Sequence, residues 1–270
     1  MGAGRAATTP TGAGGPEGPG VPPGQASPRP PTRREGPPAD LAGGRRPSDT
    51  PAFPAPLLLI PFLVAVLPAA ALAARGNFDG LYGQDPYAYY DYAVGPLRQA
   101  LGQFRPPPPF YWPPGYPLPV ALVSLLVGAR PLAGQLISLV AGGLAAVFTT
   151  LLAGEVWLAL PRRDRRSRLD GPIAGPLLAG VLLACCGQLW QSGMVVMSDT
   201  LALACATAGV WALARYGRGG GGGWLALAAG ALAWALLTRW AAAVIIVPCA
   251  AYAATVLPRR WRQAPRATAG

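Results

Sequence analysis

From Pro54 onward, long apolar blocks alternate with short polar segments, most of which contain arginine. A helix needs about 20 apolar residues to cross the hydrocarbon core of a membrane. Helices satisfy their own backbone hydrogen bonds in lipid, so each block is expected to be helical. The pattern therefore predicts an all-α, polytopic membrane bundle of about six transmembrane helices. We place these at residues 53–74, 132–160, 172–197, 200–215, 224–238 and 240–257.

The ends of the chain differ from this membrane domain, which we place at residues 51–258. Residues 1–50 are mostly Gly, Pro, Arg and small polar residues, with little apolar surface to bury. Such a segment does not offset its ordering entropy, so it is predicted to be a disordered cytoplasmic tail. Residues 259–270 form a second predicted cytoplasmic tail. The first apolar block starts past residue 50 and is long enough to span, so we interpret it as a helix and not as a signal peptide.

Residues 75–131 form a long predicted loop that contains one further apolar stretch, Gly115–Gly128. If this stretch stays outside the bilayer, 17 arginines lie on the inner side and 5 on the outer side. If it crosses, the balance becomes 8 inside and 14 outside. The positive-inside rule favours the first arrangement, with both termini inside. The stretch is thus predicted to be a juxtamembrane helix in an outer loop.

All 22 basic residues are arginine, and the chain contains no lysine and no histidine. With abundant Ala, Gly and Pro, this indicates a GC-rich coding bias and a bacterial cell membrane. The net charge of +11 lies in short clusters beside apolar blocks, which favours membrane orientation and not nucleic-acid binding. Without histidine, any acid–base chemistry falls to Asp, Glu or Tyr. The four cysteines show no metal-binding or redox spacing.

Three charged residues, Asp85, Asp199 and Arg239, fall at the outer ends of predicted elements. Each has a simple structural interpretation. Asp85 precedes Pro86 and could cap a helix, Asp199 could cap the span that follows it, and Arg239 could anchor in the headgroups. Together they offer two carboxylates for proton transfer and one guanidinium for a leaving phosphate.

The outer loop is rich in aromatic residues. Such side chains suit stacking on a sugar, and they equally suit an aromatic belt at the headgroups. Both interpretations stay open for this run, which comprises Tyr87, Tyr89, Tyr90, Tyr92, Phe110, Tyr111 and Trp112.

The order of these features resembles the C-type membrane glycosyltransferases, which include protein O-mannosyltransferases and the aminoarabinose transferase of lipid A. The shared order is a span, an Asp-x-Tyr-x-Tyr loop, Pro-Pro-Gly-Tyr-Pro with an apolar run, a second span, an Arg-rich turn, and a span ending in Met-Ser-Asp. It covers about residues 53–257, the N-terminal part of such enzymes.

The resemblance implies roles for individual residues. Asp85 corresponds to the catalytic base, Asp199 to a second acidic residue of the site, and Thr238-Arg239 to the motif that contacts the lipid phosphate. The run Pro113–Pro117 corresponds to the loop helix that floors the site. Substrate contacts are expected from the aromatic residues Tyr89, Tyr111, Trp112 and Tyr116. Tyr111 and Trp112 stand where the aminoarabinose type has an acidic and a basic residue, which argues against a lipid A enzyme.

The sequence hypothesis is a transferase that moves a sugar from a polyprenyl-phosphate donor to an acceptor on the outer membrane face. The donor and membrane lipid are its expected partners. Family members continue beyond the sixth span, so we expect a truncated or split form with a protein partner supplying the C-terminal half. The sequence assigns no definite cofactor, and an Asp85–Asp199 pair could hold a divalent cation. The alternative is a non-catalytic membrane partner subunit or a transporter-like fragment.

Overall fold

The computed structural model describes residues 53–159 and 173–263, and every regular element in these ranges is a helix. The predicted all-α class is therefore confirmed. These residues belong to one compact unit, Arg45–Gly270. The predicted disordered tail, residues 1–50, lies outside the described residues.

Within the described ranges, three helices are long and apolar enough to cross a membrane. They are α1 (Ala55–Arg75), α5 (Leu132–Ala159), and α10 (Ala243–Gln263) joined to the short 3-10 helix η5 (Trp240–Ala242). Both ends of α1 and α5, and the start of the last helix at Trp240, agree with the predicted spans to within two residues. Because α10 continues to Gln263, the predicted C-terminal tail begins with helical residues.

The segment predicted as one span at 172–197 is divided in the structure. Helix α6 (Ala174–Ala184) and helix α7 (Gly187–Met194) meet at a bend of 56°. The break falls at Cys185-Cys186, just before Gly187, and Cys186 has extended backbone angles. Cysteine and glycine are weak helix formers, and α7 carries polar Gln and Ser side chains, so an unbroken helix is not strongly favoured. The pair counts as a fourth crossing only if it is one bent span.

The last two predicted spans form α8 (Asp199–Gly217) and α9 (Gly222–Thr238). Neither is among the helices that meet the length and composition criteria for a crossing. The structure thus supports three crossings, or four with the bent pair, and the predicted six are not confirmed.

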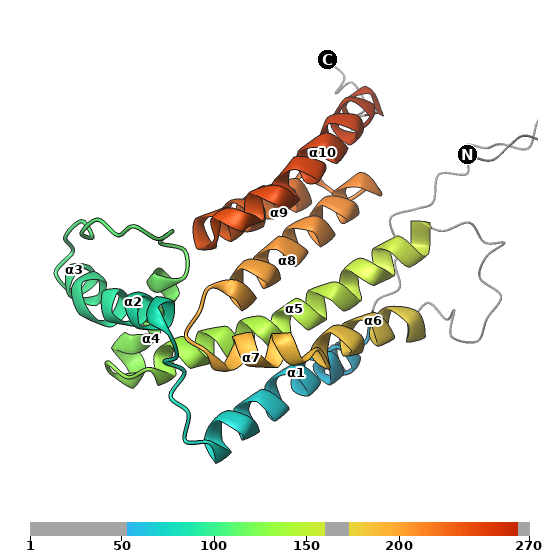
Figure 1. Cartoon of the computed structure of the whole chain (residues 1–270). Helices are drawn as coiled ribbons and strands as arrows, with labels where there is room; N and C mark the ends of the chain where they lie inside the picture. The colour runs from blue at the N-terminus through green and yellow to red at the C-terminus, as the bar shows by residue number, and fades with distance from the viewer. Residues whose placement is uncertain (1–52, 160–172, 264–270) are drawn as a thin grey trace, which may run out of the picture. The chain divides into compact units, whose positions relative to one another are not determined.

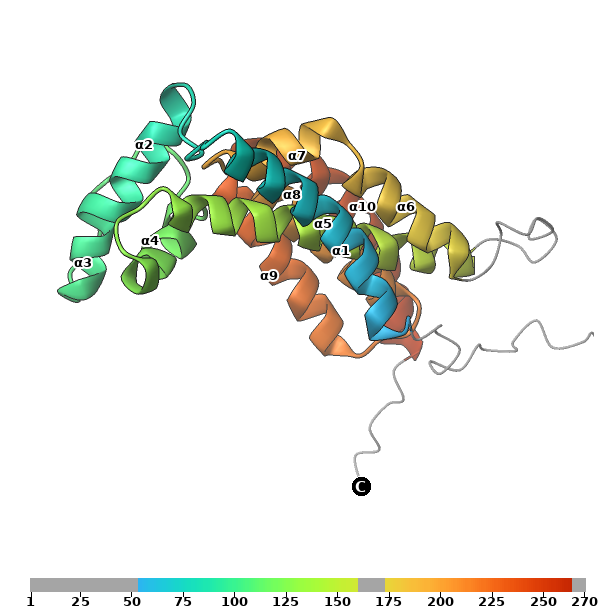
Figure 2. The ribbon, with the colours of Figure 1, turned by 90° about the horizontal axis from the view of Figure 1, so that it is seen from below.

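Helix α5 is central to the bundle and contacts α1, α4, α6, α7 and α8, while α8 also packs against α9 (Figures 1 and 2). Small residues line these contacts and let the helix backbones approach closely. A Cβ atom added at Gly209 of α8 would lie 2.7 Å from Leu232 of α9, and one added at Gly143 of α5 would lie 2.5 Å from Phe62 of α1.

The segment between α1 and α5 folds into short helices at one end of the bundle (Figure 1). They are α2 (Gln84–Tyr92), a π-helical turn η2 (Ala93–Leu97), α3 (Arg98–Gly102) and α4 (Pro117–Val127). Buried aromatic and aliphatic residues of α2, η2 and α4 form one core cluster with Ala133 and Val196. At 1.5 Å per residue, the 11 residues of α4 extend only about 16 Å, so this helix is too short to cross.

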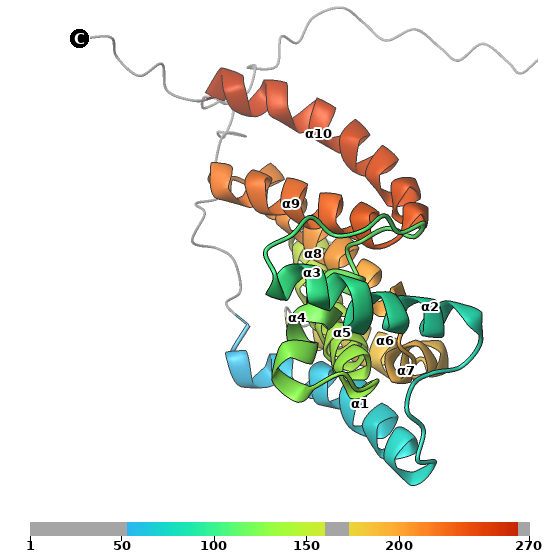
Figure 3. The same cartoon turned by 90° about the vertical axis from the view of Figure 1, so that its left-hand side faces the viewer.

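Helix α10 lies at the edge of the bundle (Figure 3) and contacts mainly α8 and η5. Only Cys249 of this helix is a buried core residue, whereas Val244 and Val247 are about three-quarters exposed, at 75% and 70%. Exposed apolar side chains on a helix of this length fit a lipid-facing surface.

Candidate functional site

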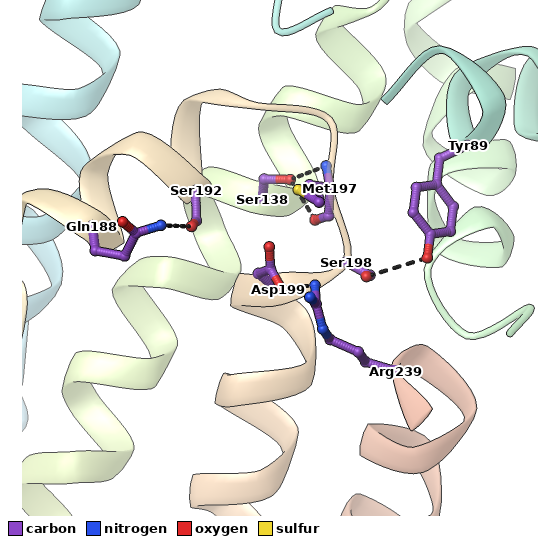
Figure 4. A network of polar contacts seen from close by, with 8 residues as sticks. All are labelled: Tyr89, Ser138, Gln188, Ser192, Met197, Ser198, Asp199 and Arg239. Atoms are coloured by element: carbon purple, nitrogen blue, oxygen red, sulfur yellow. Dashed lines mark hydrogen bonds and ion pairs between the residues drawn. The ribbon is translucent and has the colours of Figure 1, made fainter. Parts of the chain in front are cut away.

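The side chains of Asp199 and Arg239 form an ion pair where α8 begins and α9 ends (Figure 4). Arg239 has extended backbone angles and separates α9 from η5, so the helix break directs its side chain toward α8. Sequence reasoning placed both residues at the same end of the bundle, and the structure brings them into direct contact. Both side chains are partly open to solvent, with exposed fractions of 42% for Arg239 and 31% for Asp199.

Asp199 is not the N-cap of α8. Ser198 occupies that position, and no side chain makes a capping hydrogen bond there. Asp199 is the first helical residue, where its negative charge complements the helix dipole. The capping interpretation is therefore wrong for Asp199, and the ion pair with Arg239 accounts for its orientation.

The ion pair lines a cavity of about 410 Å³ between the α6–α7 bend and α8. Polar groups on the wall come from Gln188 and Ser192 of α7. The Gln188 Nε2 atom lies 3.4 Å from the Ser192 Oγ atom. The apolar part of the wall consists of Leu183, Leu189 and Leu203. A cavity with an apolar interior and a few polar groups at one end suits an amphipathic ligand.

Asp85 lies outside this cavity and is linked to it through Tyr89. The Tyr89 hydroxyl is 3.3 Å from the Ser198 hydroxyl, next to Asp199 (Figure 4). Asp85 lies four positions before Tyr89 in α2, so the two side chains share one face of the helix. The structure thus places Asp85 at the same end as Asp199 and Arg239, but no contact among the described residues joins it directly to either.

The pKa of Tyr89 depends on its burial and on the charges on both sides of its side chain. Burial raises the pKa of Tyr89 above its ordinary value of 10.0, while the Ser198 hydrogen bond and the Arg239 charge oppose this and the Asp85 charge adds to it. The phenol therefore stays protonated at neutral pH. It acts as a neutral hydrogen-bonding group between the two charged parts of the site.

Asp85 is not an N-cap either. Helix α2 begins at Gln84, its N-cap is Gly83, and no side chain makes a capping hydrogen bond. Gly83 has a φ of 79°, in the left-handed region that favours glycine. Asp85 lies in the first turn of the helix, so its capping interpretation is wrong and its carboxylate is left for another role.

The Pro-Pro-Gly-Tyr-Pro segment holds the end of α9 in place. The Gly115 N–H donates a 2.7 Å hydrogen bond to the Leu237 carbonyl, two residues before Arg239. A Cβ atom at Gly115 would lie 2.6 Å from the Thr238 hydroxyl and 2.7 Å from the Leu237 backbone, so only glycine fits without a shift. Thr238 itself is fully buried and donates to the Trp234 carbonyl at 2.7 Å. Thr238 therefore supports the helix end, and Arg239 alone is presented to the cavity.

A second set of hydrogen bonds fixes the segment that precedes Asp199. The Tyr116 hydroxyl is 2.9 Å from the Ser138 hydroxyl and 3.1 Å from the Gly134 carbonyl oxygen. Ser138 in turn contacts the Met197 carbonyl at 3.2 Å (Figure 4). Gln135 donates to the Phe78 carbonyl at 2.9 Å and to the Met194 carbonyl at 3.1 Å. These hydrogen bonds fix the backbone of residues 194–198. Because Asp199 follows directly, its position is fixed as well.

The aromatic residues expected to contact substrate differ in exposure. Tyr89 and Tyr116 are 4% and 0% exposed, so their rings pack in the core and their hydroxyls position neighbouring segments. Tyr111 is 70% exposed and offers an open ring. The indole N–H of Trp112 is buried and, within the described residues, has no hydrogen-bond acceptor. Tyr111, whose ring centroid lies 5.5 Å from that of Trp112, is therefore the better candidate for contact with a sugar.

No group of three or more metal-ligating side chains occurs in the described parts of the chain. Asp199 is paired with Arg239, and no contact among the described residues joins it to Asp85, so the Asp85–Asp199 cation pair stays a prediction.

Sequence reasoning missed Ser198, Gln188 and Ser192 as parts of this site. For Gln188 and Ser192 a signal was present, because they are polar side chains within an apolar block. Nothing in the sequence pairs Tyr89 with Ser198, which are 109 positions apart. No protein-family model, curated protein or solved structure matches this chain.

Proposed function

We propose that the protein is a membrane glycosyltransferase that uses a polyprenyl-phosphate-linked sugar as donor. The observation that carries the proposal is the half-exposed Asp199–Arg239 pair at the edge of the 410 Å³ cavity. The cavity offers an apolar wall for a lipid chain and a guanidinium for its phosphate. Asp85 lies at the same end and supplies a carboxylate that no helix cap or ion pair among the described residues uses.

Arg239 is proposed to bind the donor phosphate. A guanidinium has five N–H donors in a planar fork that matches phosphate geometry. Asp199 occupies only part of this fork, and the side chain is 42% exposed. Asp199 orients Arg239 before the donor binds. When the donor is bound, some of the guanidinium N–H groups donate to the phosphate oxygens in place of Asp199.

Asp85 is proposed to act as the general base. Its carboxylate takes the proton of an acceptor hydroxyl, the hydroxyl oxygen forms a bond to the anomeric carbon, and the bond from that carbon to the phosphate oxygen breaks. The electron pair leaves with the polyprenyl phosphate, whose charge Arg239 stabilises. A single displacement of this kind inverts the configuration at the anomeric carbon. The exposed Tyr111 would contact the sugar.

We further propose six crossings with both termini on the inner side of a bacterial cell membrane, as the arginine balance favours. Helices α8 and α9, with 19 and 17 residues, extend about 28 and 26 Å, close to the thickness of the hydrocarbon core. Cysteine substitutions at Gly102 and Gly221, both in open space, test the sidedness in a background without the native cysteines. Impermeant thiol reagents should label Gly102→Cys and not Gly221→Cys in intact cells. The reverse pattern would contradict the topology and the site with it.

Binding of a polyprenyl monophosphate tests the phosphate role independently of the donor sugar. Affinity should fall in the order wild type, Arg239→Lys, Arg239→Ala, because lysine keeps the charge and loses the fork. Removal of a charge-assisted phosphate contact should weaken binding by about tenfold or more. Arg130→Ala is the matched control, since Arg130 is exposed at the same end of the bundle.

Equal affinity of the wild type, Arg239→Ala and Arg130→Ala proteins would overturn the phosphate role. Arg239 would then be an interfacial anchor. The alternative interpretation of the chain as a non-catalytic partner subunit would gain support from that result.

A further inference from the structure

The C-terminal ends of α5, α8 and α10 lie at the other end of the bundle (Figure 1), and a second charged cluster is found there. Glu155 of α5 is only 4% exposed, and its two carboxylate oxygens pair with Arg215 at 3.3 Å and Arg218 at 2.5 Å. Two arginines share one carboxylate, so the three groups together carry a net positive charge. This cluster takes no part in the proposed transfer reaction.

Aromatic rings and backbone hold the arginines of this end in place. The Arg215 guanidinium lies over the Trp224 ring, 5.0 Å from its centroid. Arg260 of α10 lies over the Tyr216 ring at 5.4 Å and donates to the Gly220 carbonyl at 2.7 Å. Cation–π contacts of this kind fix the planes of the guanidinium groups. With Arg260 included, the four charged groups have a net charge of +2.

An apolar cavity of about 420 Å³ lies directly beside the cluster, between α5, α8 and α10. Glu155 and Arg218 stand at its wall, and the other lining residues are almost all apolar. Val210, Leu213, Ile245 and Pro248 are among them. The cavity therefore joins a positively charged group to an apolar space.

We propose that this end of the protein binds an anionic phospholipid. Its phosphate would contact Arg218 and Arg215, and part of one acyl chain would fill the cavity. The net charge of +2 complements an anionic headgroup, and the guanidinium groups retain donors that Glu155 does not use. The apolar lining favours an acyl chain over a free phosphate ion. The lipid would join α10, which has few other contacts, to the remainder of the bundle.

The test compares phosphatidylglycerol with phosphatidylcholine of the same acyl chains, bound to the full-length protein and counted by native mass spectrometry. The wild type should retain phosphatidylglycerol in preference to phosphatidylcholine. Arg218→Gln should weaken phosphatidylglycerol binding about fivefold, the usual contribution of one basic side chain at an anionic lipid surface. Arg105→Gln is the matched control, because Arg105 is exposed in the loop at the opposite end.

A second variant tests the cavity without changing charge. Ala214→Phe places a ring in the space that the acyl chain would fill, so it should also reduce phosphatidylglycerol retention. Polyprenyl monophosphate binding at the Arg239 end should persist in Arg218→Gln and Ala214→Phe, which separates this proposal from the proposed function.

Three results would overturn the proposal. The first is equal phosphatidylglycerol binding by Arg218→Gln and Arg105→Gln. The second is full retention of the lipid by Ala214→Phe. The third is thermal stabilisation of the wild type by inorganic phosphate to the same extent as by phosphatidylglycerol, which would assign the site to a free anion.

Discussion

Helix α8 carries two charged clusters, one at each end, and they differ in burial and stoichiometry. At its start, Asp199 pairs one-to-one with Arg239, and both side chains are about one-third exposed or more. Near its end, about 24 Å away at 1.5 Å per residue, Glu155 is 4% exposed and shared by two arginines. A half-exposed pair exchanges one partner for water or a ligand at small cost, whereas a buried carboxylate does not. The first arrangement suits a site that binds and releases substrate, and the second suits a permanent positive surface.

The largest effect on stability is expected at the buried cluster. Glu155→Leu removes the carboxylate and leaves two arginines close together without their counter-charge. Breaking a buried pair in this way costs about 3–5 kcal/mol, and the partial exposure of both arginines favours the lower end of that range. Unfolding by denaturing detergent measures the change. A loss below about 1 kcal/mol would mean that this cluster is no more fixed than the Asp199–Arg239 pair.

A smaller loss is expected where the loop meets α9. Gly115→Ala pushes a methyl group against the Leu237 backbone, so the end of α9 must move, at a cost of about 1–3 kcal/mol. The shift should also weaken polyprenyl monophosphate binding, because Arg239 follows two residues later. Gly102→Ala, in a helix with open space around the Cβ position, is the control and should keep wild-type stability and binding. Unchanged binding by Gly115→Ala would separate this contact from the site.

Tyr89→Phe removes the hydroxyl that contacts Ser198 and should cost about 0.5–1.5 kcal/mol. The change also has a pH signature. Because the folded-state pKa of Tyr89 is raised, its contribution to stability is fully present below about pH 10 and is lost as the pH rises through the folded pKa. The wild type should therefore lose more stability than Tyr89→Phe between pH 9 and pH 11. Parallel pH profiles would show that Tyr89 is not the group that titrates.

The smallest effect on stability is expected for Asp199→Asn. A half-exposed pair contributes about 0–1 kcal/mol, so the free energy of unfolding should change little. Polyprenyl monophosphate affinity should still change, because Arg239 loses the group that orients it. A stability loss as large as that of Glu155→Leu would remove the contrast between the two ends of α8.

Several features of the fold could be predicted from the sequence because they depend on hydropathy and length. Both ends of α1 and α5 follow directly from the apolar blocks, as does the start of the last span at Trp240. The bend at Cys185-Cys186 was missed, because the length and hydropathy of the block outweighed the weak helix formers and polar side chains within it. The predicted number of crossings is not confirmed, because three of the six apolar blocks form shorter or bent helices.

The sequence predicted at which end of the bundle the candidate site lies, but not which side chains contact one another there. Asp199 and Arg239 were placed at one end by topology, yet their direct pairing depends on how α9 stops. Asp85 before Pro86 suggested a helix cap, but the N-cap is Gly83 and the helix already begins at Gln84. Glu155 was overlooked, although a carboxylate inside an apolar block is itself a sign of a buried partner.

The most direct test of the central claim is sugar transfer by the Asp85→Asn protein, measured in native membranes with a polyprenyl-phosphate-linked donor. Asparagine keeps the size of the side chain and loses the proton acceptor, so transfer should fall roughly 10²–10⁴-fold. Stability should change by no more than about 1 kcal/mol, the contribution of one charge at a helix N-terminus. Asp91→Asn, exposed on the same helix, should retain transfer. Wild-type transfer by correctly inserted Asp85→Asn protein would contradict the account.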